Sequence, residues 1–182
     1  MDDADIHQWG YGQNITVRLL RSLWAGALVE PGLNAWYDGE QGMRMIHKGM
    51  DVGMAVDTAD GLFVAALRNV HNSSISAVRA SIDRLKENVS NRSIPPDDLK
   101  DYTIMLSNFG IFAGRYATPI INPPCVCIVA AGKLMNQVVP VLGGFEVHKT
   151  IPLSLTFDHR AATGGEAARF LMAMIADLVL RD

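Results

Sequence analysis

Hydrophobic and polar residues alternate in several stretches of the chain, and this period of two is typical of a β-strand with one buried face. The pattern is clearest in residues 151–157, where Ile, Leu, Leu and Phe alternate with Pro, Ser and Thr. Residues 57–61 have the composition of a turn between two strands. Further strands are expected in the apolar or β-branched runs 43–48, 52–56, 62–67, 102–106, 125–131 and 137–142.

Apolar residues at intervals of three and four predict three amphipathic helices. The first is expected to begin at a Thr16 cap and end before Pro31, the second to cover residues 75–89, and the third to follow Thr163. The expected buried face of the first helix is Leu20, Leu23, Trp24, Ala27 and Leu28. Together with the strands, these helices predict an α/β (α+β) fold, a two-layer sandwich in which a mixed sheet carries the helices on one face.

A single domain accounts for most of the chain, because 182 residues can bury one sizeable core but are too few for two comfortable ones. Residues 1–13 are polar, contain glycine and show no periodicity, and we interpret them as a flexible N-terminal arm. Residues 14–182 are then the core domain.

The charge and hydrophobic content of the chain indicate which kinds of partner it can bind. The net charge is −3 with only 16 Lys and Arg residues and no basic cluster, which argues against nucleic acid or an anionic membrane as a partner. Hydrophobic residues make up 49% of the chain, so part of the surface is expected to be buried against other subunits. No apolar run is long enough to span a membrane, and the acidic N-terminus is unlike a signal peptide, so we expect an intracellular protein.

The cysteines and most of the histidines give no sign of a metal site. Cys125 and Cys127 are expected on one face of a strand, poorly placed for a disulfide and suited to core packing. A two-thiol metal site would need further ligands nearby. No acid or cysteine companion at ligand spacing accompanies the remaining histidines outside the loop described next, namely His7, His47, His71 and His148.

The candidate chemistry lies in residues 157–165, where His159 stands between Asp158 and Arg160. This loop follows the strand 151–157 and precedes a capping box formed by Thr163 and Glu166, so a side chain there can be held in place and still meet a ligand. Asp158 and Arg160 are expected to act as an ion pair or as backbone braces. A loop histidine alone is more often structural than catalytic, so further motifs must decide.

Those motifs resemble a known family. Asp158-His159-Arg160 followed by two small residues and Gly164 resembles the signature of the acyltransferase core of 2-oxo acid dehydrogenase complexes, the dihydrolipoamide acyltransferases. The resemblance extends in unbroken order over about residues 15–180. Its other segments are 34–39, 53–68, 106–110 and 118–124. It implies a chloramphenicol-acetyltransferase-like fold and a homotrimer that can build a larger core together with the other components of a dehydrogenase complex.

The resemblance also implies an activity, namely transfer of an acyl group between coenzyme A and a dihydrolipoyl thiol. Coenzyme A would be a substrate, and the lipoyl group would arrive in trans, since no lipoyl attachment site is recognised in this chain. His159 would be the base, and Ser107 from a neighbouring subunit would stabilise the oxyanion. No residues are assigned to coenzyme A binding. The expected location is the cytoplasm, or the mitochondrial matrix in a eukaryote.

Two departures from the family leave an alternative open. By the resemblance, Thr163 stands where the family has an aspartate four residues after the histidine. The usual N-terminal part of the catalytic domain is also expected to be absent. A catalytically impaired scaffold subunit is therefore the second hypothesis. Our hypothesis for Thr163 is that its hydroxyl caps the last helix, so that the loop keeps its geometry without an ionic clamp. Acetylation of a hydroxyl, as in chloramphenicol acetyltransferase, fits poorly because a second histidine is usual where Asp158 stands. The identity of the acyl group stays open.

Overall fold

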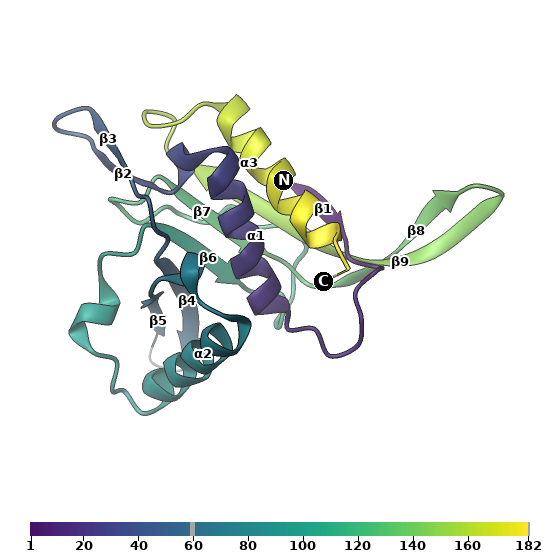
Figure 1. Ribbon diagram of the computed structural model, residues 1–182, viewed down its shortest axis with the longest axis horizontal. Coiled ribbons are helices and arrows are strands. Elements are labelled where there is room, and N and C mark those ends of the chain that lie inside the picture. Colours follow the sequence, from purple (N-terminus) through teal and green to yellow (C-terminus); the bar gives the residue numbers. More distant parts are fainter. Residues whose placement is uncertain (59–60, 182) are drawn as a thin grey trace.

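One mixed β-sheet runs through the molecule, and three α-helices cover one of its faces (Figure 1). The structure is a computed structural model that describes residues 1–58 and 61–181. The strands are β1 (Asp2–Asp5), β4 (Val52–Thr58), β5 (Gly61–Leu67), β6 (Ile104–Asn108), β7 (Cys127–Ala131), β8 (Met135–Val141) and β9 (Gly144–Phe157). Their order is β1-β9-β7-β6-β4-β5, with β8 paired to β9. The pairs β4–β6 and β6–β7 are parallel and the others antiparallel, which confirms the expected mixed sheet.

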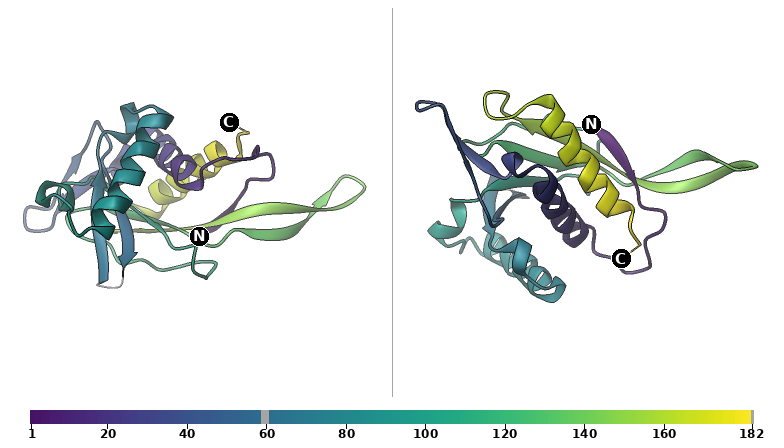
Figure 2. Two further views of the ribbon diagram at one scale, coloured as in Figure 1. Left: turned by 90° about the horizontal axis from the view of Figure 1, so that it is seen from below. Right: turned by 45° about the horizontal axis from the view of Figure 1, so that its top comes forward.

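The helices are α1 (Ile15–Val29), α2 (Ile75–Ser90) and α3 (Gly164–Val179). Helices α1 and α3 lie side by side, with α3 packed over β1 and β9, whereas α2 covers β4 and β5 (Figures 1 and 2). A separate two-stranded hairpin is formed by β2 (Ala35–Asp38) and β3 (Met43–Ile46). The three helices and the two-layer arrangement were all predicted by apolar spacing.

Apolar side chains gather on both faces of the sheet, since successive residues of a strand point to opposite sides. The main core lies under the helices and includes Leu106, Val129 and Leu153. A small second cluster on the other face contains Tyr102, Met105, Cys125 and Ile128. Cys127 belongs to the main core instead. The prediction that both cysteines share a strand face was therefore wrong, because Cys125 precedes β7.

Both thiols are free and buried, as the prediction of core packing requires. Burial raises the pKa of Cys125 to about 12 and raises the pKa of Cys127 as well, so neither thiol ionises near neutral pH.

Two details of α1 differ from the prediction. Asn14 caps the helix through its side-chain oxygen, which accepts a hydrogen bond from the Val17 amide, whereas Thr16 already lies inside the helix. Leu28 is 65% exposed, and Leu19 is buried in its place. The apolar stripe of this helix is wide, so spacing alone does not fix which edge of it meets the core.

Residues 2–6 are not a loose arm. β1 pairs antiparallel with β9 at the edge of the sheet, and Ala4 and Ile6 are buried in the main core. The four-residue strand is too short and too acidic for its alternation to be recognised. The predicted turn at 57–61 falls partly on residues 59 and 60, which lie outside the described residues.

The outer part of β9 and all of β8 project from the body of the molecule as a long hairpin (Figure 2). Four apolar side chains on this hairpin are largely exposed, namely Val138, Leu142, Phe145 and Val147. Among the described residues, no helix is long and apolar enough to cross a membrane.

Candidate active site

The His159 loop begins where β9 ends, and an ion pair shapes it. The Asp158 carboxylate accepts hydrogen bonds from the Arg160 amide at 2.9 Å and from the Arg160 guanidinium at 2.6 to 3.2 Å. This confirms the expected role of the two residues as an ion pair and a backbone brace. Chiefly through the hydrogen bond from Arg160, the pKa of Asp158 is held below its ordinary value.

The β2–β3 hairpin fastens the loop from outside. The Arg160 guanidinium lies over the Tyr37 ring at 5.0 Å, and Arg44 donates hydrogen bonds to the Ala161 carbonyl and to the Glu166 carboxylate. Tyr37 and Arg44 were not singled out in the sequence. Their partners lie more than a hundred residues away along the chain, and no local sequence pattern predicts such a contact.

Thr163 ends the loop and starts α3. Its hydroxyl accepts a hydrogen bond from the Glu166 amide at 3.2 Å, and the Glu166 carboxylate accepts one from the Thr163 amide at 2.7 Å. The predicted capping box is therefore confirmed. At the position of the family's aspartate, Thr163 thus caps the helix N-terminus with both its amide and its hydroxyl. All of residues 158–165 lie within the described part of the chain.

The imidazole of His159 is presented to solvent at the end of the sheet. Its ring packs against the Phe157 ring with centroids 4.5 Å apart and planes inclined by 56°. The His159 residue is exposed, and no hydrogen bond to its ring nitrogens forms within residues 1–58 and 61–181. Both nitrogens are thus available to a substrate or to a second protein chain.

Ser107 occupies the carboxyl-terminal part of β6, between Ala55 of β4 and Ala130 of β7. It is half-buried. By strand alternation it shares a face with Met105, away from the helices. Within the described residues its hydroxyl forms no hydrogen bond, so this donor is also unused.

His159 and Ser107 lie toward opposite ends of the sheet in one chain. Ser107 pairs with Ala130 of β7, whereas Phe157 pairs with Cys127 at the start of that strand. His159 lies two residues beyond Phe157, which places it roughly 16 Å from Ser107 along the strands at about 3.3 Å per residue. The strand β7 also lies between them. The two side chains of one protomer therefore do not form one site.

Two of the other four histidines form hydrogen bonds through their ring nitrogens. The Nδ1 of His71 accepts a hydrogen bond from the Met50 amide at 3.0 Å. His148 has acidic companions, which the sequence spacing failed to show: Nδ1 is 2.5 Å from Asp5 and Nε2 is 3.2 Å from Glu146. The prediction that this histidine has no acidic partner was wrong because Asp5 reaches it only through the β1–β9 pairing.

The family model described as 2-oxoacid dehydrogenases acyltransferase (catalytic domain) matches residues 13–179. The chain belongs to this family. Its relatives include the dihydrolipoyllysine-residue acetyltransferase component of the pyruvate dehydrogenase complex of Mycoplasma pneumoniae, 36% identical over 77% of this chain and 35% of that protein. The dihydrolipoyllysine-residue succinyltransferase component of the 2-oxoglutarate dehydrogenase complex of Pseudomonas aeruginosa is 33% identical over 82% and 36%. The chain thus spans about a third of the length of these relatives.

Solved structures agree with the family assignment. The cubic core of the pyruvate dehydrogenase multienzyme complex and the dihydrolipoamide acetyltransferase of Azotobacter vinelandii each match with a TM-score of 0.91 and 28% identity, over 98% of this chain and 79% of theirs. Chloramphenicol acetyltransferase matches with a TM-score of 0.61 at 14% identity over 97% of this chain and 86% of its own, which shows the shared fold alone.

For the Azotobacter vinelandii enzyme, a serine, a histidine and an asparagine have been investigated for their role in the catalytic mechanism. The serine precedes the histidine there by as many residues as separate Ser107 from His159. The asparagine follows the histidine at the spacing that separates Thr163 from His159.

Proposed function

We propose that this chain is a dihydrolipoamide acyltransferase, which moves an acyl group between coenzyme A and a dihydrolipoyl thiol with His159 as base. The observation that carries the proposal is the matched spacing of Ser107, His159 and Thr163 to the three residues investigated in the Azotobacter vinelandii enzyme. The exposed imidazole at the end of β9, which forms no hydrogen bond within the described residues, supports it.

The chemistry follows from the properties of a thiol. A thiol with a reference pKa of about 8.5 is mostly protonated at neutral pH, so His159 takes its proton as the sulfur attacks the thioester carbonyl carbon. The new carbon–sulfur bond gives a tetrahedral intermediate with a negative oxygen. When that intermediate collapses, the old carbon–sulfur bond breaks and the departing sulfur recovers the proton from His159. Because one thioester replaces another, the reaction can run in both directions.

Ser107 would donate a hydrogen bond to the negative oxygen, which is worth about 3 kcal/mol where water is excluded. Since His159 and Ser107 of one chain lie toward opposite ends of the sheet, the serine must come from a second copy. We therefore propose a homotrimer or a larger core in which each site lies between two protomers. The exposed apolar side chains of the β8–β9 hairpin provide a surface for such contacts.

The scaffold alternative rested on Thr163, and the site geometry weakens that argument. Thr163 caps α3 and completes a closed hydrogen-bond pair with Glu166, so the absence of an aspartate leaves no unpaired charge in the loop. The asparagine at this spacing in the Azotobacter vinelandii enzyme is uncharged as well. An acidic group here is therefore not part of the proposed chemistry.

Partners and location follow from the same proposal. Coenzyme A acts as a substrate, a lipoyl group is delivered in trans, and the other components of a 2-oxo acid dehydrogenase complex assemble around this core. The proposed location is the cytoplasm, where two unpaired cysteines persist readily. Relatives named for acetyl and succinyl transfer match with similar identity, so the acyl group must be found by assay.

The test measures acyl transfer to free dihydrolipoamide from acetyl-, succinyl- and isobutyryl-coenzyme A. The native chain is expected to turn over at least one donor, and His159→Ala to lower kcat by about 10²- to 10⁴-fold. Ser93→Ala, which truncates an exposed serine in the segment after α2, serves as the control and keeps the native rate. Background rates for the native chain with all three donors would contradict the proposal and favour the scaffold.

A further inference from the structure

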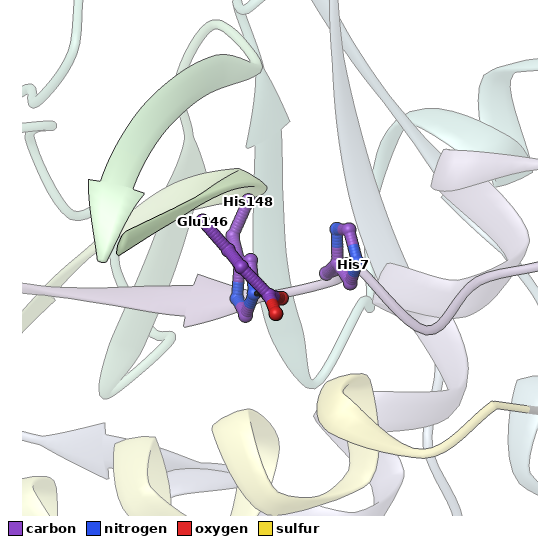
Figure 3. Close-up of side chains that lie close together, drawn as sticks. All are labelled: His7, Glu146 and His148. Atoms are coloured by element: carbon purple, nitrogen blue, oxygen red, sulfur yellow. Dashed lines mark hydrogen bonds and ion pairs between the residues drawn. The ribbon is translucent and has the colours of Figure 1, made fainter. Parts of the chain in front are cut away.

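Two histidines and a glutamate converge at the base of the projecting hairpin (Figure 3). Glu146 and His148 are two residues apart on β9 and therefore share a face of the strand, while His7 follows the end of β1. Extension of the β1–β9 register places His7 opposite His148, and their rings stack with centroids 4.1 Å apart. The potential ligand atoms of the three residues all lie within 4.8 Å of one another.

His148 has the carboxylate partner that is typical of a metal-binding histidine. Its Nδ1 lies 2.5 Å from the Asp5 carboxylate and can donate its N–H to it, while Nε2 faces Glu146. Metal-binding histidines in proteins characteristically donate their second ring N–H to a carboxylate, which fixes the tautomer and the direction of the ring. The His148 side chain is only 15% exposed, so this direction is held by packing as well.

The distance between His148 and Glu146 also suits a metal. Nε2 and Oε2 are 3.2 Å apart. Two ligand atoms bound to one tetrahedral zinc at about 2.0–2.1 Å stand roughly 3.3–3.4 Å from each other. The distance between these two atoms therefore matches one edge of a coordination tetrahedron.

From this geometry we infer that His7, Glu146 and His148 form a binding site for a divalent transition-metal ion of the Zn²⁺ class, with Asp5 supporting His148 from the second side. Two imidazole nitrogens and one carboxylate oxygen match the ligands of zinc and its neighbours, whereas Mg²⁺ and Ca²⁺ prefer oxygen alone. Three protein ligands leave the fourth position for water.

His7 is the ligand that must move. Its ring is nearly parallel to that of His148, with 10° between the planes, and a metal in the plane of one ring lies outside the plane of the other. His7 is exposed, so its side chain can turn to bring a nitrogen to the ion. The bound ion would then tie the end of β1 to the hairpin. This site is independent of the acyl transfer proposed for His159.

Zinc binding to the full chain, freed of affinity tags and of metal, tests the inference by equilibrium dialysis with metal analysis. The expected result is one Zn²⁺ per chain. His7→Ala, Glu146→Gln and His148→Ala should each weaken binding strongly, and Asp5→Asn should weaken it by about 10- to 100-fold. Matched controls are His159→Ala and Glu40→Gln, which remove an exposed histidine and an exposed glutamate outside the cluster and should bind zinc as the native chain does.

Cobalt provides a second readout, which reports the kind and geometry of the ligands as well as binding. Co²⁺ in place of zinc should show the visible absorption of a tetrahedral site without a thiolate charge-transfer band, since Cys125 and Cys127 are buried away from the cluster. Circular dichroism establishes that each variant is folded. Failure of the folded native chain to bind zinc, or equal binding by His148→Ala, would overturn the inference, as would a thiolate band.

Discussion

At the scale of single residues, His159 owes its position to its neighbours rather than to bonds of its own. Asp158 and Arg160 brace the backbone on either side of it, and Phe157 supports its ring. The imidazole itself is left unbonded within the described residues. This arrangement suits a base, because an imidazole that exchanges a proton with substrate needs at least one ring nitrogen free of hydrogen bonds to its own protein.

Arg160→Gln should therefore affect activity more than stability. The Asp158–Arg160 pair is largely exposed on the arginine side, and such solvent-screened pairs contribute little to the free energy of unfolding. Loss of the brace and of the Tyr37 contact should lower kcat at least several-fold while the urea midpoint changes little. Kinetics and urea unfolding on the same preparation measure the two effects. A large loss of stability with native kcat would contradict this assignment.

His148 should give the metal-free chain a pH-dependent stability. Hydrogen bonds to Asp5, then to Glu146, raise its pKa above the ordinary value of 6.5. A group whose pKa is raised by folding stabilises the protein fully below its unfolded pKa, and this contribution disappears as pH rises through the folded pKa. The thermal midpoint of the native chain should thus fall from pH 6 upward relative to that of His148→Gln. Asp5, Glu146 and His7 face this ring, and parallel curves for the two proteins would exclude its titration as the cause.

At the scale of elements, the ends of helices and strands decide the details of the fold. Asn14 caps α1 and Thr163 caps α3, and each fixes where its helix starts. The capping box of α3 was predictable because all of its contacts are local. The cap of α1 was not, since Asn14 and Thr16 are both acceptable caps in sequence.

Thr163→Ala should destabilise the protein by about 1 kcal/mol, because the Glu166 amide loses its acceptor. Thr163→Asp keeps an acceptor at the cap and should retain most of the stability. Chemical unfolding of both variants measures this difference. Equal losses in the two variants would show that the side chain acts by something other than capping.

The β1 strand should be essential to stability despite its polar sequence. Ile6, just after β1, is 2% exposed in the main core, so Ile6→Ala should cost about 2–5 kcal/mol. Asp2→Ala changes an exposed residue of the same segment and is the matched control. Urea unfolding distinguishes a packed strand from a loose arm, and a negligible effect of Ile6→Ala would restore the loose-arm interpretation.

At the scale of the whole molecule, sequence periodicity predicted most of the strands, the three helices and the His159 loop, since each depends on neighbouring residues. Three features depended on contacts between distant segments and were missed. These are the edge strand β1, the Arg44 and Tyr37 contacts to the loop, and the meeting of Asp5 with His148. Cys125 and Cys127 also lie in clusters on opposite faces of the sheet. Predicting this would have required knowing at which residue β7 begins.

The placement of His159 and Ser107 toward opposite ends of one sheet has a consequence for assembly. Each proposed site takes its base from one protomer and its oxyanion donor from another, so a monomer should be inactive. Two inactive chains can then restore activity when they assemble together, because one supplies the intact histidine and the other the intact serine.

Complementation between His159→Ala and Ser107→Ala tests this claim most directly. Each variant alone should show at most about 10⁻² of the native rate. After joint unfolding and refolding of an equal mixture, random assembly places an intact histidine against an intact serine in roughly a quarter of the sites of a cyclic oligomer. The account predicts recovery to about that fraction of native activity in the mixture and no recovery in either variant refolded alone. A mixture no more active than its two components, although light scattering shows mixed oligomers, would contradict it.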